Sequence, residues 1–151
     1  MIRGLIKKYW RNERDEKKEQ LDDDMAHPVR VEALIVEDND DETLFLAGLL
    51  RQQNVISTCA HSIAGALECL GSAQRYQLAF VDLNLPNGSG IEVVRRIKEN
   101  RRHCHVIVLS GAIEKIPLVV GYGYIGVLGK PYNASNIGEI LWKHRLPCNS
   151  Y

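Results

Sequence analysis

Short apolar runs alternate with amphipathic stretches from residue 31 to about residue 145. The runs consist mainly of Val, Ile, Leu and Ala and are bounded by polar residues, which is typical of strands buried on both faces. The stretches between them repeat apolar residues at helical spacing. The predicted strands are residues 31–36, 55–60, 78–83, 106–110 and 125–128.

The amphipathic stretches begin near residues that cap helices well. The candidates are Asp40 or Asp41 for the first helix, Ser62 for the second and Asn133 or Ser135 for the last, while a further helix starts at about Gly90. The first helix carries Leu44, Phe45, Ala47, Leu49 and Leu50. Residues 111–123 contain Pro117 and two glycines, which predicts a short or broken helix.

Strands that alternate with helices indicate βαβ units with right-handed crossovers and a parallel sheet. We therefore predict an α/β domain over residues 31–145, followed by a tail over residues 146–151. No GxGxxG follows the first strand and no GxxxxGK[ST] occurs, so the dinucleotide-binding and P-loop classes lack their fingerprints.

Residues 1–30 have a different character, with an amphipathic helix followed by a charged linker. The helix could dock on its own domain or on a second copy in a homodimer, bind another protein, or contact an anionic membrane surface through residues 1–14. Met25 is a possible alternative start of translation, which would remove most of this extension.

The charge balance is neutral, with 19 basic and 19 acidic residues, so no global field attracts nucleic acid. No apolar run is long enough to span a bilayer and no signal peptide is visible, which predicts a cytoplasmic protein. The four cysteines form no CxxC pair and suggest no disulfide framework.

The polar residues at the ends of the strands carry the candidate chemistry. The carboxyl ends of parallel strands meet at one edge of a sheet, where ligands bind in open α/β folds. At that edge the first strand ends in Glu37 and Asp38, the third in Asp82, the fourth in Ser110 and the fifth in Lys130. We therefore expect three carboxylates, a hydroxyl and an ammonium group to converge.

Three clustered carboxylates repel one another, and a divalent cation relieves this repulsion. A site with oxygen ligands alone suits Mg²⁺. Lys130 and Ser110 add a charge and a hydroxyl for phosphoryl oxygens, and a carboxylate such as Asp82 is able to form an aspartyl-phosphate. The sequence thus predicts phosphoryl transfer to a carboxylate.

The motifs "LIVEDND", "FVDLNLPNGSG", "VIVLSG" and "VLGKPYN" occur in this order, and with them the chain resembles the receiver domain of two-component response regulators. The resemblance covers about three-quarters of the chain. It implies a five-stranded parallel sheet of order 2-1-3-4-5 with helices on both faces. It also implies a phosphoacceptor signalling protein, not an enzyme, whose slow self-dephosphorylation is its only turnover.

Residue by residue, Asp82 resembles the phosphoacceptor of this family. Asp38 resembles the acid that binds Mg²⁺ directly, and Glu37 the acid that binds it through water. Asn84 stands where a backbone carbonyl binds the metal. Ser110 and Lys130 resemble the hydroxyl and the ammonium group that meet the phosphoryl group, and the peptide bond after the lysine is often cis in the family.

The resemblance implies a sensor histidine kinase or a histidine phosphotransfer protein as the phosphoryl donor. We expect no effector domain in the chain, so that output occurs by binding another protein or by onward phosphotransfer. Val127 occupies the position where the family often has an aromatic switch. The separation of Ser110 and Lys130, 20 residues, is shorter than usual in the family, and Pro and Gly stand where its fourth helix normally runs. These departures keep open a phosphorylation-independent interaction module. A Mg²⁺-dependent hydrolase is disfavoured, because Asn84 stands where it would need a second acid.

Overall fold

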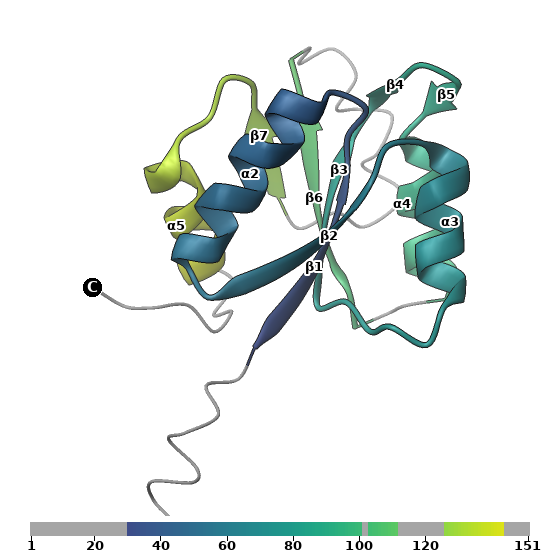
Figure 1. Cartoon of the computed structure of the whole chain (residues 1–151), viewed down its shortest axis with the longest axis horizontal. Coiled ribbons are helices and arrows are strands. Elements are labelled where there is room, and N and C mark those ends of the chain that lie inside the picture. Colours follow the sequence, from purple (N-terminus) through teal and green to yellow (C-terminus); the bar gives the residue numbers. More distant parts are fainter. Residues whose placement is uncertain (1–29, 101–102, 112–125, 144–151) are drawn as a thin grey trace, which may run out of the picture. The chain divides into compact units, whose positions relative to one another are not determined.

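The computed structural model describes residues 30–100, 103–111 and 126–143. Its centre is a five-stranded parallel sheet (Figure 1). The strands are β1 Val31–Val36, β2 Val55–Ala60, β3 Leu78–Asp82, β6 His105–Ser110 and β7 Gly126–Gly129. Their order, β2-β1-β3-β6-β7, confirms the predicted 2-1-3-4-5 arrangement of the five main strands.

Four helices among the described residues cover the two faces of this sheet. They are α2 Asp40–Gln52, α3 Ile63–Gly71, α4 Ile91–Asn100 and α5 Ala134–Lys143. Figure 1 shows α2 and α5 on one face and α3 and α4 on the other. None of the helices in this part of the chain is long and apolar enough to cross a membrane.

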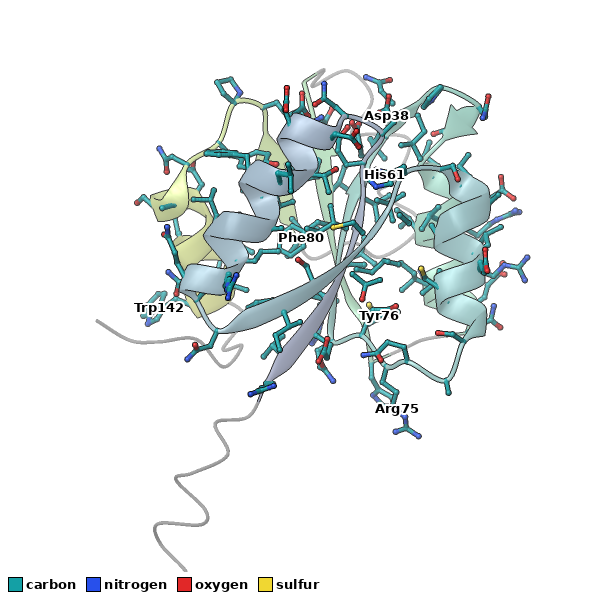
Figure 2. The ribbon with its side chains drawn as sticks, viewed as in Figure 1. Asp38, His61, Arg75, Tyr76, Phe80 and Trp142 are labelled. Carbon is teal, nitrogen blue, oxygen red and sulfur yellow. The ribbon has the colours of Figure 1, made fainter. Side chains whose placement is uncertain are left out.

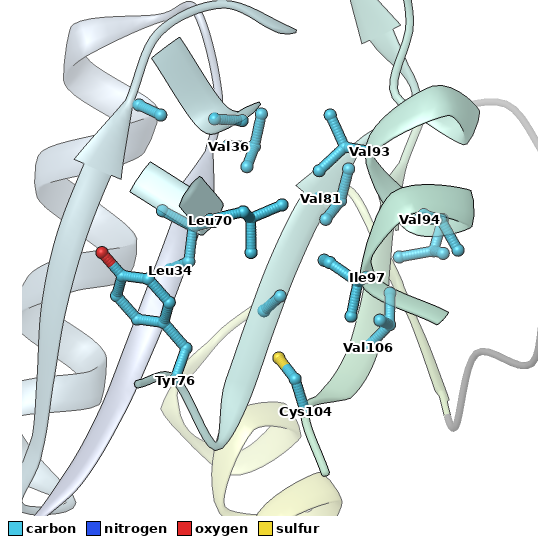
Figure 3. Packing of buried hydrophobic residues seen from close by; sticks show 14 of the residues in the cluster. Leu34, Val36, Leu70, Tyr76, Val81, Val93, Val94, Ile97, Cys104 and Val106 are labelled. Atoms are coloured by element: carbon cyan, nitrogen blue, oxygen red, sulfur yellow. The ribbon is translucent and has the colours of Figure 1, made fainter. Parts of the chain in front are cut away.

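Two apolar clusters fill the space between the sheet and these helices. Successive residues of a strand point to opposite faces, and all five residues of β3 are buried. Phe80 packs with α2 and α5 residues such as Leu46 and Ile137. Its neighbour Val81 packs with α3 and α4 residues, as Figure 3 shows for Leu70 and Ile97. The central strands therefore lie between two cores.

The helix caps follow the predictions in part. Ser62 accepts the backbone N–H of Gly65, which confirms it as the cap of α3. The side chains and backbone N–H groups of Asn133 and Asn136 bond reciprocally at the start of α5. The cap of α2 was predicted one or two residues too late, because Asn39 accepts the backbone N–H of Glu42.

The buried face of α2 contains only some of the apolar residues that the predicted helix carries. Leu44 and Phe45 are 71% and 52% exposed, whereas Thr43, Leu46 and Leu50 are the buried residues of this helix. Apolar residues occupy almost every position from Leu44 to Leu50, so the sequence of α2 alone does not define one stripe.

A short hairpin with two residues in each strand follows β3, and the sequence pattern did not predict it. It pairs β4 Asn84–Leu85 with β5 Gly88–Ser89 in antiparallel fashion. The predictions for the N-terminal helix, for residues 112–123 and for the tail over residues 146–151 lie outside the described residues.

Candidate functional site

The carboxyl edge of the sheet brings four charged side chains together. Lys130 follows β7, and its Nζ donates to Glu37 Oε2 at 2.7 Å and to Asp82 Oδ2 at 2.8 Å. It donates a third hydrogen bond to Glu42 Oε2, from the first turn of α2. Two of the three predicted acids, Glu37 and Asp82, thus meet the lysine, and Glu42 takes the place expected for Asp38 as the third acid of the group.

Backbone groups hold the remaining oxygens of the two buried acids. Asp82 Oδ1 accepts the N–H of Asn84 at 2.8 Å, and Glu37 Oε1 accepts the N–H of Asn39 at 3.1 Å. Both carboxylates are buried. Each acid thus has one oxygen fixed by the loop that follows its strand and one oxygen facing Lys130, which orients both carboxylates toward the same point.

Gly90 permits the tight turn behind Asp82. Its N–H donates to Leu83 O at 3.2 Å, which closes the loop that contains the β4–β5 hairpin. A Cβ atom at this position would overlap the Asp82 carbonyl oxygen and lie 2.9 Å from Val81 Cγ1. Only glycine fits such a close backbone approach, so this residue helps to determine where the Asp82 backbone lies.

The other predicted site residues surround this group. Ser110 is buried at the end of β6, and its carbonyl oxygen accepts the Lys130 N–H at 2.9 Å. Asn84 is exposed at the start of β4. Asp38 is exposed in the loop that follows β1 (Figure 2). The peptide bond between Lys130 and Pro131 is cis.

His61 supports the backbone of the acidic loop. Its Nδ1 donates to Glu37 O at 3.1 Å and lies 3.6 Å from Asp40 Oδ1. Thr43 donates from its hydroxyl to Asn39 O at 2.8 Å on the other side of the same loop. His61, directly after β2, and Thr43, in α2, thus fix the loop between β1 and α2.

The site has more negative than positive charge, and this shifts the pKa values of its members. Burial raises the pKa of Glu37 to about 7, the Lys130 ammonium opposes the rise, and the adjacent Asp82 adds to it. Burial lowers the pKa of Lys130, but its three carboxylate partners outweigh burial and keep the value above its ordinary range. Lys130 is therefore a permanent cation among acids that repel one another.

The donor set fits a hard divalent cation. Carboxylate oxygens of Glu37, Glu42 and Asp82 lie within 4.8 Å of one another, and two of these residues are buried. Oxygen ligands and excess negative charge are the features that favour Mg²⁺. Within the described ranges no other group of acidic, His or Cys side chains clusters in this way, and Asp38 is not a member of the cluster.

Sequence reasoning did not identify Glu42 as a site residue. Its only signal is the spacing Asn39-x-x-Glu42, which resembles a capping box. That pattern normally directs the acid toward the N-cap backbone, so it did not indicate a contact with a lysine 88 positions away.

The chain belongs to the response regulator receiver domain family, whose model matches residues 33–141. It is 30% identical over 110 residues to the photosynthetic apparatus regulatory protein RegA of Cereibacter sphaeroides. The match covers 72% of this chain and 59% of RegA. The family assignment confirms the resemblance found in the sequence motifs and identifies a domain of two-component signalling.

Two solved structures extend the comparison. A CheY-like receiver domain from Methylobacillus flagellatus is 25% identical, with a TM-score of 0.69, and the match covers 76% of this chain and 98% of that one. A response regulator protein from Burkholderia pseudomallei is 27% identical, with a TM-score of 0.67, and the match covers 74% of this chain and 66% of that one. The latter contains a phosphorylated aspartic acid, a calcium ion and citrate.

Proposed function

We propose that this receiver domain accepts a phosphoryl group on Asp82 in a Mg²⁺-dependent reaction. The observation that carries the proposal is the contact of Lys130 Nζ with Asp82 Oδ2 at 2.8 Å, inside a group of carboxylates at the end of the central strand. Family membership and the phosphorylated aspartic acid of the Burkholderia pseudomallei relative support it.

The reaction transfers a phosphoryl group from a phosphohistidine of a sensor kinase or of a histidine phosphotransfer protein. An Asp82 carboxylate oxygen forms the new bond to phosphorus as the bond from phosphorus to the histidine nitrogen breaks, and the nitrogen retains the electron pair. Lys130 stabilises the negative oxygens of the transferred group, and the hydroxyl of Ser110, at the end of β6, donates to them.

Glu37, Asp38 and Asp82, with the Asn84 backbone carbonyl, would hold Mg²⁺, which when bound neutralises the charge of the acids and of the phosphoryl oxygens. The aspartyl-phosphate then shifts the protein between two conformations and changes its affinity for a partner, or passes the phosphoryl group on. Slow loss of the acyl phosphate to water resets the site.

Electrophoresis in Phos-tag gels after incubation with acetyl phosphate and Mg²⁺ tests the proposal. The wild type should show a shifted band that Asp82→Asn abolishes and that EDTA prevents. Asp41→Asn is a matched control, because it removes an exposed carboxylate from the first turn of α2 without changing Asp82. An unshifted wild type, or a shift that persists in Asp82→Asn, would rule the proposal out.

Phosphotransfer from purified histidine kinases, with Asp82→Asn as the control, would then identify the donor. Rapid and Asp82-dependent transfer from one kinase is the expected result.

A further inference from the structure

Lys130 uses all the protons of its ammonium group in the structure. A lysine ammonium has three N–H donors. Here Glu37, Asp82 and Glu42 each accept one of them. When Asp82 is phosphorylated, the phosphoryl oxygens replace its carboxylate as acceptors, and they compete for the other two donors with Glu37 and Glu42, which remain carboxylates.

The local structure of the β1–α2 loop explains why Glu42 reaches Lys130. In a capping box, the acid three residues after the N-cap accepts the backbone N–H of the N-cap residue. Here Glu37 Oε1 accepts the Asn39 N–H instead, while Asn39 Oδ1 accepts the Glu42 N–H at 3.0 Å. The Glu42 carboxylate is thereby left to extend across the site to the lysine.

The contact with Glu42 is the easiest of the three to release. The Glu42 side chain is 43% exposed, whereas those of Glu37 and Asp82 are 2% and 6% exposed. Water solvates an exposed carboxylate when its partner leaves, but a buried carboxylate left without its cation is costly. Lys130 therefore exchanges Glu42 for the phosphoryl oxygens more readily than it exchanges the buried Glu37.

We propose that Glu42 is a positioning residue that restrains Lys130 in the unphosphorylated protein and slows the phosphorylation of Asp82. The restraint acts through competition for the lysine N–H groups and through repulsion of the anionic phosphoryl donor. This inference rests on the proposed function of Asp82. It adds a residue of α2 to the set that the sequence motifs indicated.

Removing the charge of Glu42 should have two opposite effects. Phosphorylation at saturating Mg²⁺ should become faster, because Lys130 is held less strongly and the donor meets less repulsion. Binding of Mg²⁺ should become weaker, because one of the clustered negative charges is lost. General damage to the site would instead slow the reaction as it weakened metal binding, so the pair of measurements separates a positioning role from a structural one.

The test compares Glu42→Gln, which keeps the shape of the side chain, with the neighbouring Asp41→Asn. The phosphorylation rate constant is measured with acetyl phosphate on Phos-tag gels at saturating Mg²⁺, and the Mg²⁺ dissociation constant by titration calorimetry. Glu42→Gln should raise both quantities by about threefold or more, because a unit charge a few ångströms away acts through a largely hydrated medium. Asp41→Asn should change each less than about twofold.

Rate constants for Glu42→Gln that equal or fall below those of Asp41→Asn would overturn the inference and leave the proposed function intact. A wild type that acetyl phosphate does not phosphorylate would instead overturn both. Circular dichroism checks that the variants are folded. Glu42→Ala, which retains good helix propensity, provides a second variant with the same expected directions if the glutamine variant fails to fold.

Discussion

Glu37 is the buried acid whose charge costs the most at this site. It faces both Asp82 and the single cation Lys130, and burial raises its pKa to about 7. A carboxylic acid with this pKa is close to half-protonated near neutral pH, so the charge at the site responds to anything that favours its ionised form. A bound divalent cation does so directly, because metal ligands have to be deprotonated.

We predict that in metal-free buffer Glu37 makes the protein less stable as the pH rises from about 4.5 to about 7. The unfolded chain loses this proton near the ordinary pKa of 4.5, whereas the folded protein retains it until about 7. The native state therefore binds more protons in this window, and the free energy of unfolding falls as they dissociate.

Urea denaturation with EDTA at about pH 5 and about pH 7 measures this effect. The wild type should lose about 1–3 kcal/mol more than Glu37→Gln between the two values. Saturating Mg²⁺ should reduce the difference, since it favours the ionised acid. Equal pH slopes for the two proteins in EDTA would contradict the assignment of this proton to Glu37.

The sequence allowed a site residue to be predicted where the end of a strand determines its position. Glu37, Asp82, Ser110 and Lys130 each end a strand or follow one directly, and parallel strands bring their carboxyl ends together. Glu42 lies on a helix, where a contact depends on side-chain direction and on the exact rotation of the helix. That rotation is determined by packing against the rest of the domain, so it cannot be predicted from the sequence pattern of the helix.

Among the elements, strands were predicted more accurately than helix faces. The bounds of β1 and β2 agree with the predicted ranges, because a buried parallel strand is a short apolar run between polar residues. The sequence did not define the buried face of α2, where Leu44 and Phe45 are exposed, since consecutive apolar residues are compatible with several rotations. The β4–β5 hairpin has two residues per strand, which is too short for a periodic pattern.

The backbone conformation of the loop after β3 depends on Gly90. We predict that Gly90→Ala lowers the free energy of unfolding by about 2–4 kcal/mol, because the added Cβ meets backbone that has no room to move. Thermal or urea unfolding measures the change. The variant should also be phosphorylated more slowly, since its strain displaces the backbone of Asp82.

Gly48→Ala is the matched control for this substitution. Gly48 lies within α2, and a Cβ there has no atom within 4 Å. The same change should therefore stabilise the protein by about 0.5–1 kcal/mol through helix propensity. Similar losses of stability at both glycines would show that the close approach at Gly90 does not determine the outcome.

Across the described domain, the residues that form the core and the charged residues of the site occupy different regions. The apolar clusters occupy the two faces of the sheet, and the charged site lies at its carboxyl edge. Phe80 is fully buried in the α2–α5 cluster, only two residues before Asp82. The central strand therefore links the core to the site, and loss of packing in the core is expected to displace Asp82.

The two phenylalanines of the chain provide a direct comparison. Phe80→Ala should cost about 3–5 kcal/mol, because it leaves a cavity between the sheet and its helices. Phe45 is exposed and stacks on Tyr132 with ring centroids 6.0 Å apart. Phe45→Ala should cost about 1 kcal/mol or less. Urea denaturation of both variants tests this, and similar costs would contradict the division between core and surface.

The bond from Lys130 to Glu37 spans 93 positions of the chain, and the bond to Asp82 spans 48. A ribosome therefore releases all three acids of the site well before it releases their lysine. Domains generally fold as units during synthesis, and Lys130 directly follows β7, the strand that pairs with β6. A nascent chain that ends before β7 lacks the cation that the three carboxylates share, so we expect the proposed phosphoacceptor site to be completed only when synthesis of the domain is nearly finished.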